Sequence, residues 1–230
     1  MRALISHEIA ERFSSVTGIE TIPLYPYNKL DLPVQCHADM LFCVLDNVIF
    51  CYGDYVTEHD LLDILKESGK KVVFVSSECS SSYPHDISLN VLIMGKTLFA
   101  NTAYTAKEIL DYASARGYKI VDVRQGYAAC STLVVNSETA VTADVGMYNA
   151  IKSIGKECYL VKQNDVLLNG YNCGFYGGAS GILNGEVCFF GDVSNMLCGE
   201  EILAFLAKKN VSILPILSGR VYDFGGFKLI

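Results

Sequence analysis

The sequence lacks the features that mark several large classes of protein. It has no run of about 18 apolar residues, so no transmembrane helix and no membrane partner are predicted. Residues 1–13 carry charges throughout and contain no apolar stretch of the kind that a signal peptide needs. No block of lysine and arginine is longer than two residues and the formal net charge is −7, so we expect no nucleic-acid partner.

The cysteines lack the spacing of a redox or metal-binding motif. There are nine of them, an odd number, and no two form a Cys-x-x-Cys pair. Without a predicted signal peptide, this usage indicates a reducing compartment, so we expect a cytoplasmic protein with free thiols. We expect no cofactor. A metal site made by Cys130, His37 and Asp39 stays an alternative that no clustered ligand spacing supports.

The chain also lacks a linker or a low-complexity stretch that would divide it. Of its 230 residues, 51% are hydrophobic and 19% are charged, which is enough apolar surface to offset the entropy of ordering. The nearest candidate for a break, residues 76–84, is rich in serine and is predicted to be a surface loop. We therefore expect one domain over residues 1–230. Whether it forms a homo-oligomer is left open.

What is present is a repeated order of elements: a strand, a short turn, a second strand, a capped helix and a third strand. The first copy has strands over 40–45 and 48–52, a helix capped by Thr57 and ended by Gly69, and a strand over 71–75. Three further copies follow, with hairpin turns at 95–96, 136–138 and 184–185 and with helix caps at Thr105 (in a capping box with Glu108) and Asp144.

The two ends of the chain together complete a fifth copy. The sequence ends in a strand over 227–230 and begins with a strand over 2–5, a helix capped by Ser6, and a strand over 19–25. The five predicted helix stops are Gly18, Gly69, Gly117, Gly155 and Asn210. A repeat of about 46 residues predicts five α/β units of ββαβ order, arranged in a ring that the termini close. The alternative is an ordinary mixed α/β domain whose repeat is coincidental.

Two segments at predicted strand starts carry side chains capable of chemistry. If the strand predicted over 40–45 continues back to residue 36, His37 and Asp39 point to one side of it and Cys36 to the other, because side chains alternate along a strand. An imidazole beside a carboxylate suits acid–base chemistry on a bound cation, although a solvated strand end is the alternative. Cys130 lies at the matching strand start of the third unit, and in a ring it would approach His37 and Asp39. Its alternative is a buried free thiol.

The unit pattern, with His37-Ala38-Asp39-Met40 and the stretch 127–135 (YAACSTLVV), resembles the guanidino-group-modifying superfamily, or penteins. That group includes arginine deiminase, agmatine deiminase and dimethylarginine dimethylaminohydrolase. The resemblance implies a five-bladed α/β propeller (the pentein fold). It also implies that the Cys130 thiolate attacks a guanidinium carbon, that His37 protonates the leaving amine and then activates water, and that Asp39 holds substrate N–H groups.

Two departures from the family pattern bear on the substrate. Where deiminases usually have Glu-Gly-Gly, this chain has Phe224 before Gly225 and Gly226, and the side chain of the preceding Asp223 is expected to point to the other face. Where the family has an aspartate that grips the guanidinium, the stretch 174–181 (GFYGGASG) has no carboxylate. Gly177 and Gly178 would let backbone N–H groups approach a ligand instead.

These residues lead to three hypotheses. The first is a cofactor-independent, amidinohydrolase- or deiminase-like enzyme that acts on a non-peptide C–N bond of a small guanidino-, amidino- or amide-type substrate. Cys130 and His37 would be catalytic, and the substrate contacts would be Asp39, Asp223, Gly177 and Gly178. The second is a non-catalytic pentein-fold protein that binds a small ligand or a protein partner. The third is a site for a phosphate-containing ligand at 174–181.

Overall fold

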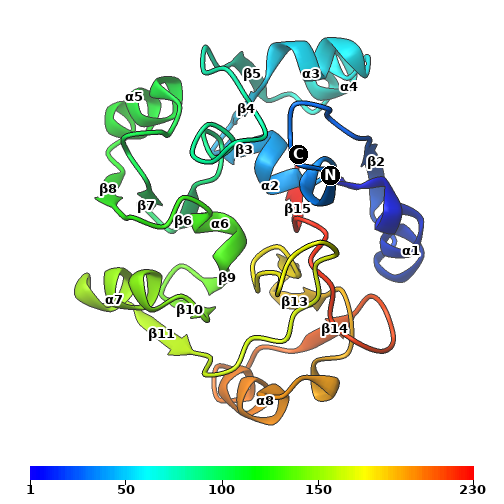
Figure 1. Cartoon of the computed structure of the whole chain (residues 1–230), viewed down its shortest axis with the longest axis vertical. Helices are drawn as coiled ribbons and strands as arrows, with labels where there is room; N and C mark the ends of the chain where they lie inside the picture. Colours follow the sequence, from blue (N-terminus) through cyan, green and yellow to red (C-terminus); the bar gives the residue numbers. More distant parts are fainter.

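The strands of the protein form five separate three-stranded sheets in the computed structural model, which describes residues 1–230. Within each sheet, the first two strands are antiparallel, a helical segment follows, and the third strand pairs parallel to the second. Figure 1 shows the five units in chain order around a common centre. The expected mixed α/β fold of ββαβ units is therefore present. No hydrogen-bonded ladder joins the five into one closed sheet.

The elements of the first four units follow in chain order. The strands are β3 (Phe42–Leu45), β4 (Val48–Cys51), β5 (Lys71–Phe74), β6 (Leu92–Met94), β7 (Thr97–Ala100), β8 (Lys119–Asp122), β9 (Thr132–Asn136), β10 (Thr139–Thr142), β11 (Glu157–Leu160), β12 (Ser180–Leu183), β13 (Glu186–Phe189) and β14 (Ile213–Pro215). The helices between second and third strands are α3 (Gly53–Glu58), α4 (Leu62–Glu67), α5 (Lys107–Ala115), α7 (Val145–Ser153) and α8 (Gly199–Ala207), the last preceded by the 3₁₀ turn η2 (Val193–Asn195).

The fifth unit is built from both ends of the chain, as predicted. Strand β15 (Phe227–Leu229) pairs antiparallel with β1 (Arg2–Ser6), with Ala3 opposite Leu229. After helix α1 (His7–Thr17), β2 (Glu20–Leu24) pairs parallel with β1. A short 3₁₀ turn, η1 (Leu32–Val34), lies on the way to the first unit.

The helix ends were predicted more reliably than the helix starts. All five predicted stops have positive φ, between 57° and 83°, a conformation that favours glycine and asparagine. Ser6 and Asp144 are side-chain caps, accepting from the backbone N–H groups of Glu8 and Met147.

The predicted caps at Thr57 and Thr105 are wrong. Helix α3 already begins at Gly53, and the Thr57 hydroxyl donates to the Gly53 carbonyl. The Thr105 hydroxyl donates to the Asn101 carbonyl, and Glu108 accepts from the Ser76 N–H instead of closing a capping box. A threonine hydroxyl can bond the carbonyl four residues back as well as it caps a helix, so its presence alone does not locate the helix start.

The strands are layered from the centre outwards. Every residue of the second strands β4, β7 and β10 is buried, whereas the third strands β5 and β8 are partly exposed. The first strands lie innermost and touch one another across units: β9 contacts both β6 and β12, and β15 contacts β3. The segments that lead into the first strands therefore converge near the centre of the molecule.

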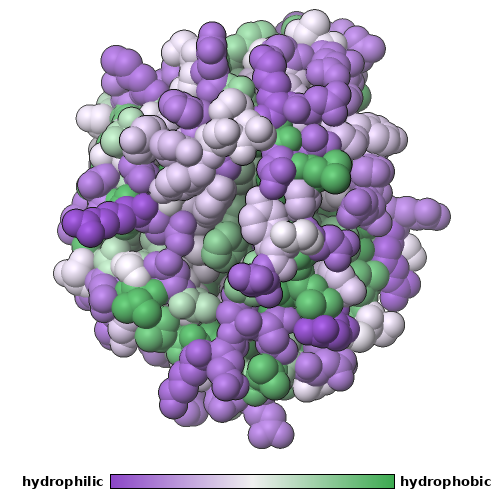
Figure 2. All heavy atoms as spheres, in the orientation of Figure 1, coloured by the Kyte–Doolittle hydropathy of each residue, from purple (hydrophilic) through white to green (hydrophobic).

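The face of the molecule seen along its shortest axis is mainly polar. Figure 2 shows a largely hydrophilic face on which apolar residues lie in scattered groups. Large exposed apolar side chains such as Leu32 and Leu197 come from separate parts of the chain, which is usual for a folded domain. None of the helices has the length and the apolar character that crossing a membrane requires.

Candidate active site

Five equivalent positions meet at the centre, each two residues before the first strand of its unit. They are Met40, Asn90, Cys130, Gly178 and Gly225. The three side chains among them are in contact: the Asn90 amide donates to Cys130 Sγ at 2.8 Å and to Met40 Sδ at 3.3 Å. The two sulfur atoms lie 3.9 Å apart. The predicted convergence of the strand starts is thus observed, and it places Cys130 at the molecular centre.

The two glycines at these positions make room for side chains from elsewhere. A Cβ atom on Gly178 would lie 2.0 Å from Asp223 Oδ1, and one on Gly225 would lie 2.3 Å from His37 Cβ. A larger residue at either position would displace an imidazole or a carboxylate. His37 and Asp223 therefore occupy space that Gly178 and Gly225 leave free.

The local structure around His37 and Asp39 differs from the prediction. Residues Ala38–Leu41 form a short helix, α2, and Ala128–Ser131 form another, α6, each directly before its strand. A short apolar run can be helix or strand, and here the Leu41 N–H bonds back to the His37 carbonyl. The strand alternation that would put His37 and Asp39 on the same side is wrong, and the two residues line different cavities.

Asp223 lies beside His37. Its Oδ1 is 3.7 Å from His37 Nδ1, and both side chains are buried. The carboxylate also accepts N–H groups from Gly225 at 2.9 Å and Phe175 at 2.8 Å. The expectation that Asp223 points to the other face is wrong, because Gly225 and Gly226 both have positive φ and turn the chain there. The geometry allows Asp223 to orient the imidazole.

Burial dominates the titration of Asp223. It raises the pKa to about 6 from a usual value of 3.8, against the stabilising charge of His37 and the two N–H donors. The nearby Asp39 carboxylate adds to the increase. Two acidic groups are therefore buried close together. A positive charge beside them would stabilise their ionised forms.

Asp39 is the least satisfied polar group at the centre. Its side chain is almost fully buried, and neither carboxylate oxygen has a hydrogen-bond partner. Burial raises its pKa, while the charges of His37 and Lys228 and the neighbouring Cys130 thiol act in the opposite direction. Buried carboxylate oxygens are nearly always paired, so two unpaired ones indicate a place for N–H donors that come from a ligand.

Cys130 is buried with its sulfur against Asn90. Burial raises the pKa of the thiol well above its usual value, and the Asp39 and Asp223 carboxylates add to the shift. No hydrogen bond joins Cys130 to His37. In this state the thiol is protonated at neutral pH, and it would ionise more readily beside a bound cation.

Sequence reasoning missed Asn90. Its amide donates to the Asp39 carbonyl as well as to Cys130 Sγ, and its Oδ1 accepts the Ala129 N–H at 2.8 Å. It therefore ties the first and third units together around the thiol. Its position in the repeat could have identified it, because Asn90 stands two residues before the first strand of its unit, as Cys130 does.

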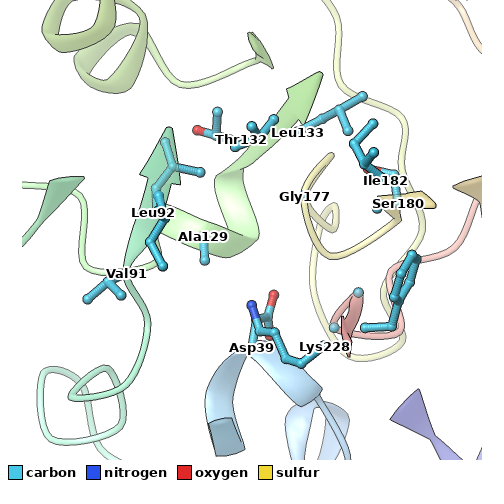
Figure 3. Close-up of a pocket in the computed structure, with 16 residues that line it drawn as sticks. Asp39, Val91, Leu92, Ala129, Thr132, Leu133, Gly177, Ser180, Ile182 and Lys228 are labelled. Atoms are coloured by element: carbon cyan, nitrogen blue, oxygen red, sulfur yellow. The ribbon is translucent and has the colours of Figure 1, made fainter. Parts of the chain in front are cut away.

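Two cavities flank this cluster. The central one, of about 240 Å³, is lined by all five units, with Asp39, Leu92, Ala129, Gly177 and Lys228 as one contribution from each. Figure 3 shows Asp39 and Lys228 reaching into it from the same side. The second, of about 390 Å³, is lined by His37, Asp223, Cys36, Glu8 and Tyr222 among others. Cys130 lines neither cavity.

The glycine-rich stretch 174–181 packs tightly against the Cys130 segment. The Gly178 N–H donates to the Cys130 carbonyl at 3.0 Å, and a Cβ on Gly177 would lie 2.0 Å from the Ala129 carbonyl. The Gly178 N–H is therefore not free for a phosphate, which removes one donor from the phosphate-site hypothesis. No group of three His, Cys, Asp or Glu side chains is placed to hold a metal ion.

A sequence family described as "Family of unknown function (DUF6873)" matches residues 3–227. The chain belongs to this family. No curated protein sequence matches the DUF6873 chain.

Solved structures of similar fold include an amidinotransferase, a dimethylarginine dimethylaminohydrolase and an agmatine deiminase. The inosamine-phosphate amidinotransferase StrB1 from Streptomyces griseus is 13% identical, with a TM-score of 0.59 and coverage of 95% of this chain and 76% of that one. A cysteine-to-serine mutant of the Pseudomonas aeruginosa dimethylarginine dimethylaminohydrolase, complexed with citrulline, is 8% identical, with a TM-score of 0.57 and coverage of 90% and 80%. A cysteine-to-serine mutant of C. jejuni agmatine deiminase with substrate bound is 11% identical, with a TM-score of 0.52 and coverage of 90% and 73%.

These three proteins are penteins, so the resemblance of the DUF6873 chain to that superfamily is confirmed at the level of the fold. Identities of 8% to 13% show a common fold alone.

The close approach of Gly178 to Asp223 leads to a stability prediction. Gly178→Ala is expected to destabilise the DUF6873 chain by about 2–4 kcal/mol, because the new methyl group must displace a buried, hydrogen-bonded carboxylate. Gly146→Ala, on the exposed first turn of α7, is the matched control and should change stability by less than about 1 kcal/mol. Urea unfolding of both variants measures the difference. Equal stability of the two variants would contradict the packing described here.

The raised pKa of Asp223 leads to a prediction on pH dependence. The native carboxyl keeps its proton up to about pH 6, whereas the unfolded one loses it near 3.8. The contribution of Asp223 to stability should therefore fall as pH rises through this interval, by at most about 3 kcal/mol. Asp223→Asn should remove this contribution from the pH dependence of stability. In contrast, Asp192→Asn should leave the pH dependence unchanged in this range, because that exposed acid, whose pKa is lowered from 3.8, is ionised in both the folded and the unfolded protein. Urea unfolding between pH 4 and 6.5 compares the slopes, and a wild-type slope in Asp223→Asn would refute the assignment.

Proposed function

We propose that the chain is a hydrolase or transferase that acts on a non-peptide C–N bond of a small guanidino-, amidino- or amide-type substrate. In this proposal the five sheets are the blades of a pentein propeller, closed by the pairing of β15 with β1. The observation that carries the proposal is the Asp39 carboxylate, which is buried beside Cys130 with both oxygens unpaired. A planar cation with several N–H donors satisfies both oxygens and supplies the missing positive charge.

The proposed chemistry uses three side chains. Cys130 loses its thiol proton to water as the cation binds, and Sγ then attacks the amidino carbon, so a C–S bond forms and, as the tetrahedral adduct collapses, the C–N bond to the leaving amine breaks. His37, oriented by Asp223, donates the proton that the leaving amine needs. Water in a hydrolase, or an acceptor amine in a transferase, then gives its proton to His37 and attacks the carbon, which releases Cys130.

A bound cation would also activate the nucleophile. Burial raises the pKa of the Cys130 thiol most, and the carboxylates of Asp39 and Asp223 raise it further; a positive ligand between them and the sulfur would offset the part that comes from the carboxylates. The thiolate would then form mainly in the complex. The fold supports this chemistry, because an amidinotransferase, a dimethylarginine hydrolase and an agmatine deiminase are among the proteins that share it.

One observation favours the non-catalytic alternative. Cys130 accepts a hydrogen bond from the Asn90 amide, lies on the wall of neither cavity and forms no hydrogen bond with His37. A protein that only binds a ligand at Asp39 does not need Cys130 to reach the ligand or to contact His37. Binding and turnover therefore have to be measured separately.

A ligand screen followed by a turnover assay tests the proposal. The melting temperature of the purified protein is measured with guanidines, amidines, ureas and amino-acid amides, because a ligand that binds the native state raises it. Each ligand that stabilises the protein is then incubated with it, and released ammonia, urea or transferred amidino groups are measured. Stabilisation with turnover supports the enzyme, and stabilisation without turnover supports the binder. No stabilisation by any cationic member contradicts the role assigned to Asp39.

A further inference from the structure

The central cavity contains two charged side chains that are not paired. Asp39 reaches it from α2 with both carboxylate oxygens free of hydrogen bonds. Lys228 reaches it from β15 and is half-buried, and its ammonium group forms neither a hydrogen bond nor an ion pair with any residue. The two are close enough for the lysine charge to lower the pKa of Asp39, yet they form no salt bridge. Figure 3 shows both on the same wall of the cavity.

Hydrogen-bonded neighbours fix the backbone positions of these two residues. The Asp39 N–H donates to the Gly225 carbonyl, and Lys228 lies opposite Leu4 in the β15–β1 pair, so each Cα is fixed by a hydrogen-bonded neighbour. An unpaired buried carboxylate and an unpaired half-buried ammonium are both costly. A single ligand with charges of both signs would pair with each of them at once.

Charge also favours a ligand with charges of both signs over a purely cationic one. A guanidinium bound at Asp39 would face the Lys228 ammonium, and like charges in a partly buried cavity repel each other. A carboxylate on the same ligand converts this repulsion into attraction. The rest of the wall has Thr132 and Ser180 beside the apolar Leu92 and Ile182, which suits a short aliphatic chain between the two charges.

We propose that the central cavity binds a short amidino or guanidino acid, with its amidino group on Asp39 and its carboxylate on Lys228. The part assigned to Asp39 rests on the proposed function, and the part assigned to Lys228 is new. Lys228 is a specificity residue in this scheme. It selects substrates that carry an acidic group only a few bonds from the amidino carbon.

A matched pair of ligands tests the proposal with Asp39 and Lys228 both unchanged. 3-Guanidinopropionate and ethylguanidine differ by one carboxylate, and propionate controls for the carboxylate alone. Calorimetric titration of the Cys130→Ser protein measures binding without turnover. We expect 3-guanidinopropionate to bind at least about tenfold more tightly than ethylguanidine, and propionate to bind weakly. Equal affinity for the two guanidines overturns the role of Lys228 and leaves the proposed function standing. If neither guanidine binds, the role of Lys228 and the proposed function are both overturned.

Variants of Lys228 locate the effect. Lys228→Met keeps the length of the side chain without the charge, and should reduce the affinity for 3-guanidinopropionate to that for ethylguanidine. Lys228→Arg should keep the preference. Asp39→Asn should reduce the affinity for both guanidines. A preference for 3-guanidinopropionate that persists in Lys228→Met would overturn the assignment. Should Lys228→Met fail to fold, the ligand pair on the protein with Lys228 intact and on Lys228→Arg still decides.

Discussion

Replacing Cys130 with alanine is expected to abolish turnover of an amidino substrate, with kcat reduced by at least about 1000-fold. The proposed reaction passes through a C–S bond, and no other side chain at the centre can form a comparable adduct, because the neighbouring positions are Met40, Asn90 and two glycines. The fold should survive the change, since the thiol only accepts a hydrogen bond from Asn90 and donates a weak one to the Met40 sulfur. Initial rates and urea unfolding, measured on the same preparation, separate the two effects.

Cys158→Ala is the matched control for this experiment. Cys158 is also a buried free thiol, but it lies in β11 and packs in a different apolar cluster from Cys130. Its removal should leave kcat within about twofold of wild type. If Cys130→Ala retains more than about a tenth of wild-type kcat, the thiol is not the nucleophile, and the proposed covalent mechanism is wrong.

The order of the units could be predicted because each one is marked by local chemistry. Gly69, Gly117 and Gly155 end their helices in a left-handed conformation that few other residues adopt. The Asn184-Gly185 turn likewise has positive φ at both residues. Such signals depend only on neighbouring residues, so they can be read without knowledge of the fold. Their repetition then places Cys130 near the centre.

The arrangement inside the centre could not be predicted in the same way. Whether Asp223 faces His37 depends on a turn at Gly225 and on space left by Gly178, and these residues meet only after three units have come together. The apolar run after His37 also fits a strand as well as the helical turn that it forms. The sequence therefore identifies the ionisable residues but not which cavity each one lines.

The state of the Cys130 thiol leads to the second large expected effect. Its pKa is well above the usual value, so a neutral alkylating reagent should find little thiolate at pH 7.5. 2-Chloroacetamidine and 2-chloroacetamide have nearly the same shape, but only the first is a cation. Both alkylate a thiolate by forming a C–S bond and releasing chloride. The cation is expected to accumulate at Asp39 and to lower the thiol pKa there.

Cys130 should therefore react at least about tenfold faster with 2-chloroacetamidine than with 2-chloroacetamide, after correction for the reactivity of each reagent with glutathione. Peptide mass spectrometry at pH 7.5 measures the two rates at each cysteine. Cys173 is a control in the same molecule, because it is half-exposed and should show no such preference. Asp39→Asn should remove the preference at Cys130 while leaving Cys173 unchanged. A preference of equal size at both thiols, or one that survives Asp39→Asn, would mean that the buried carboxylate does not recruit the cation. The substrate would then have to be recognised from the His37 side of the cluster, where Asp223 and Glu8 are the acidic groups of the second cavity.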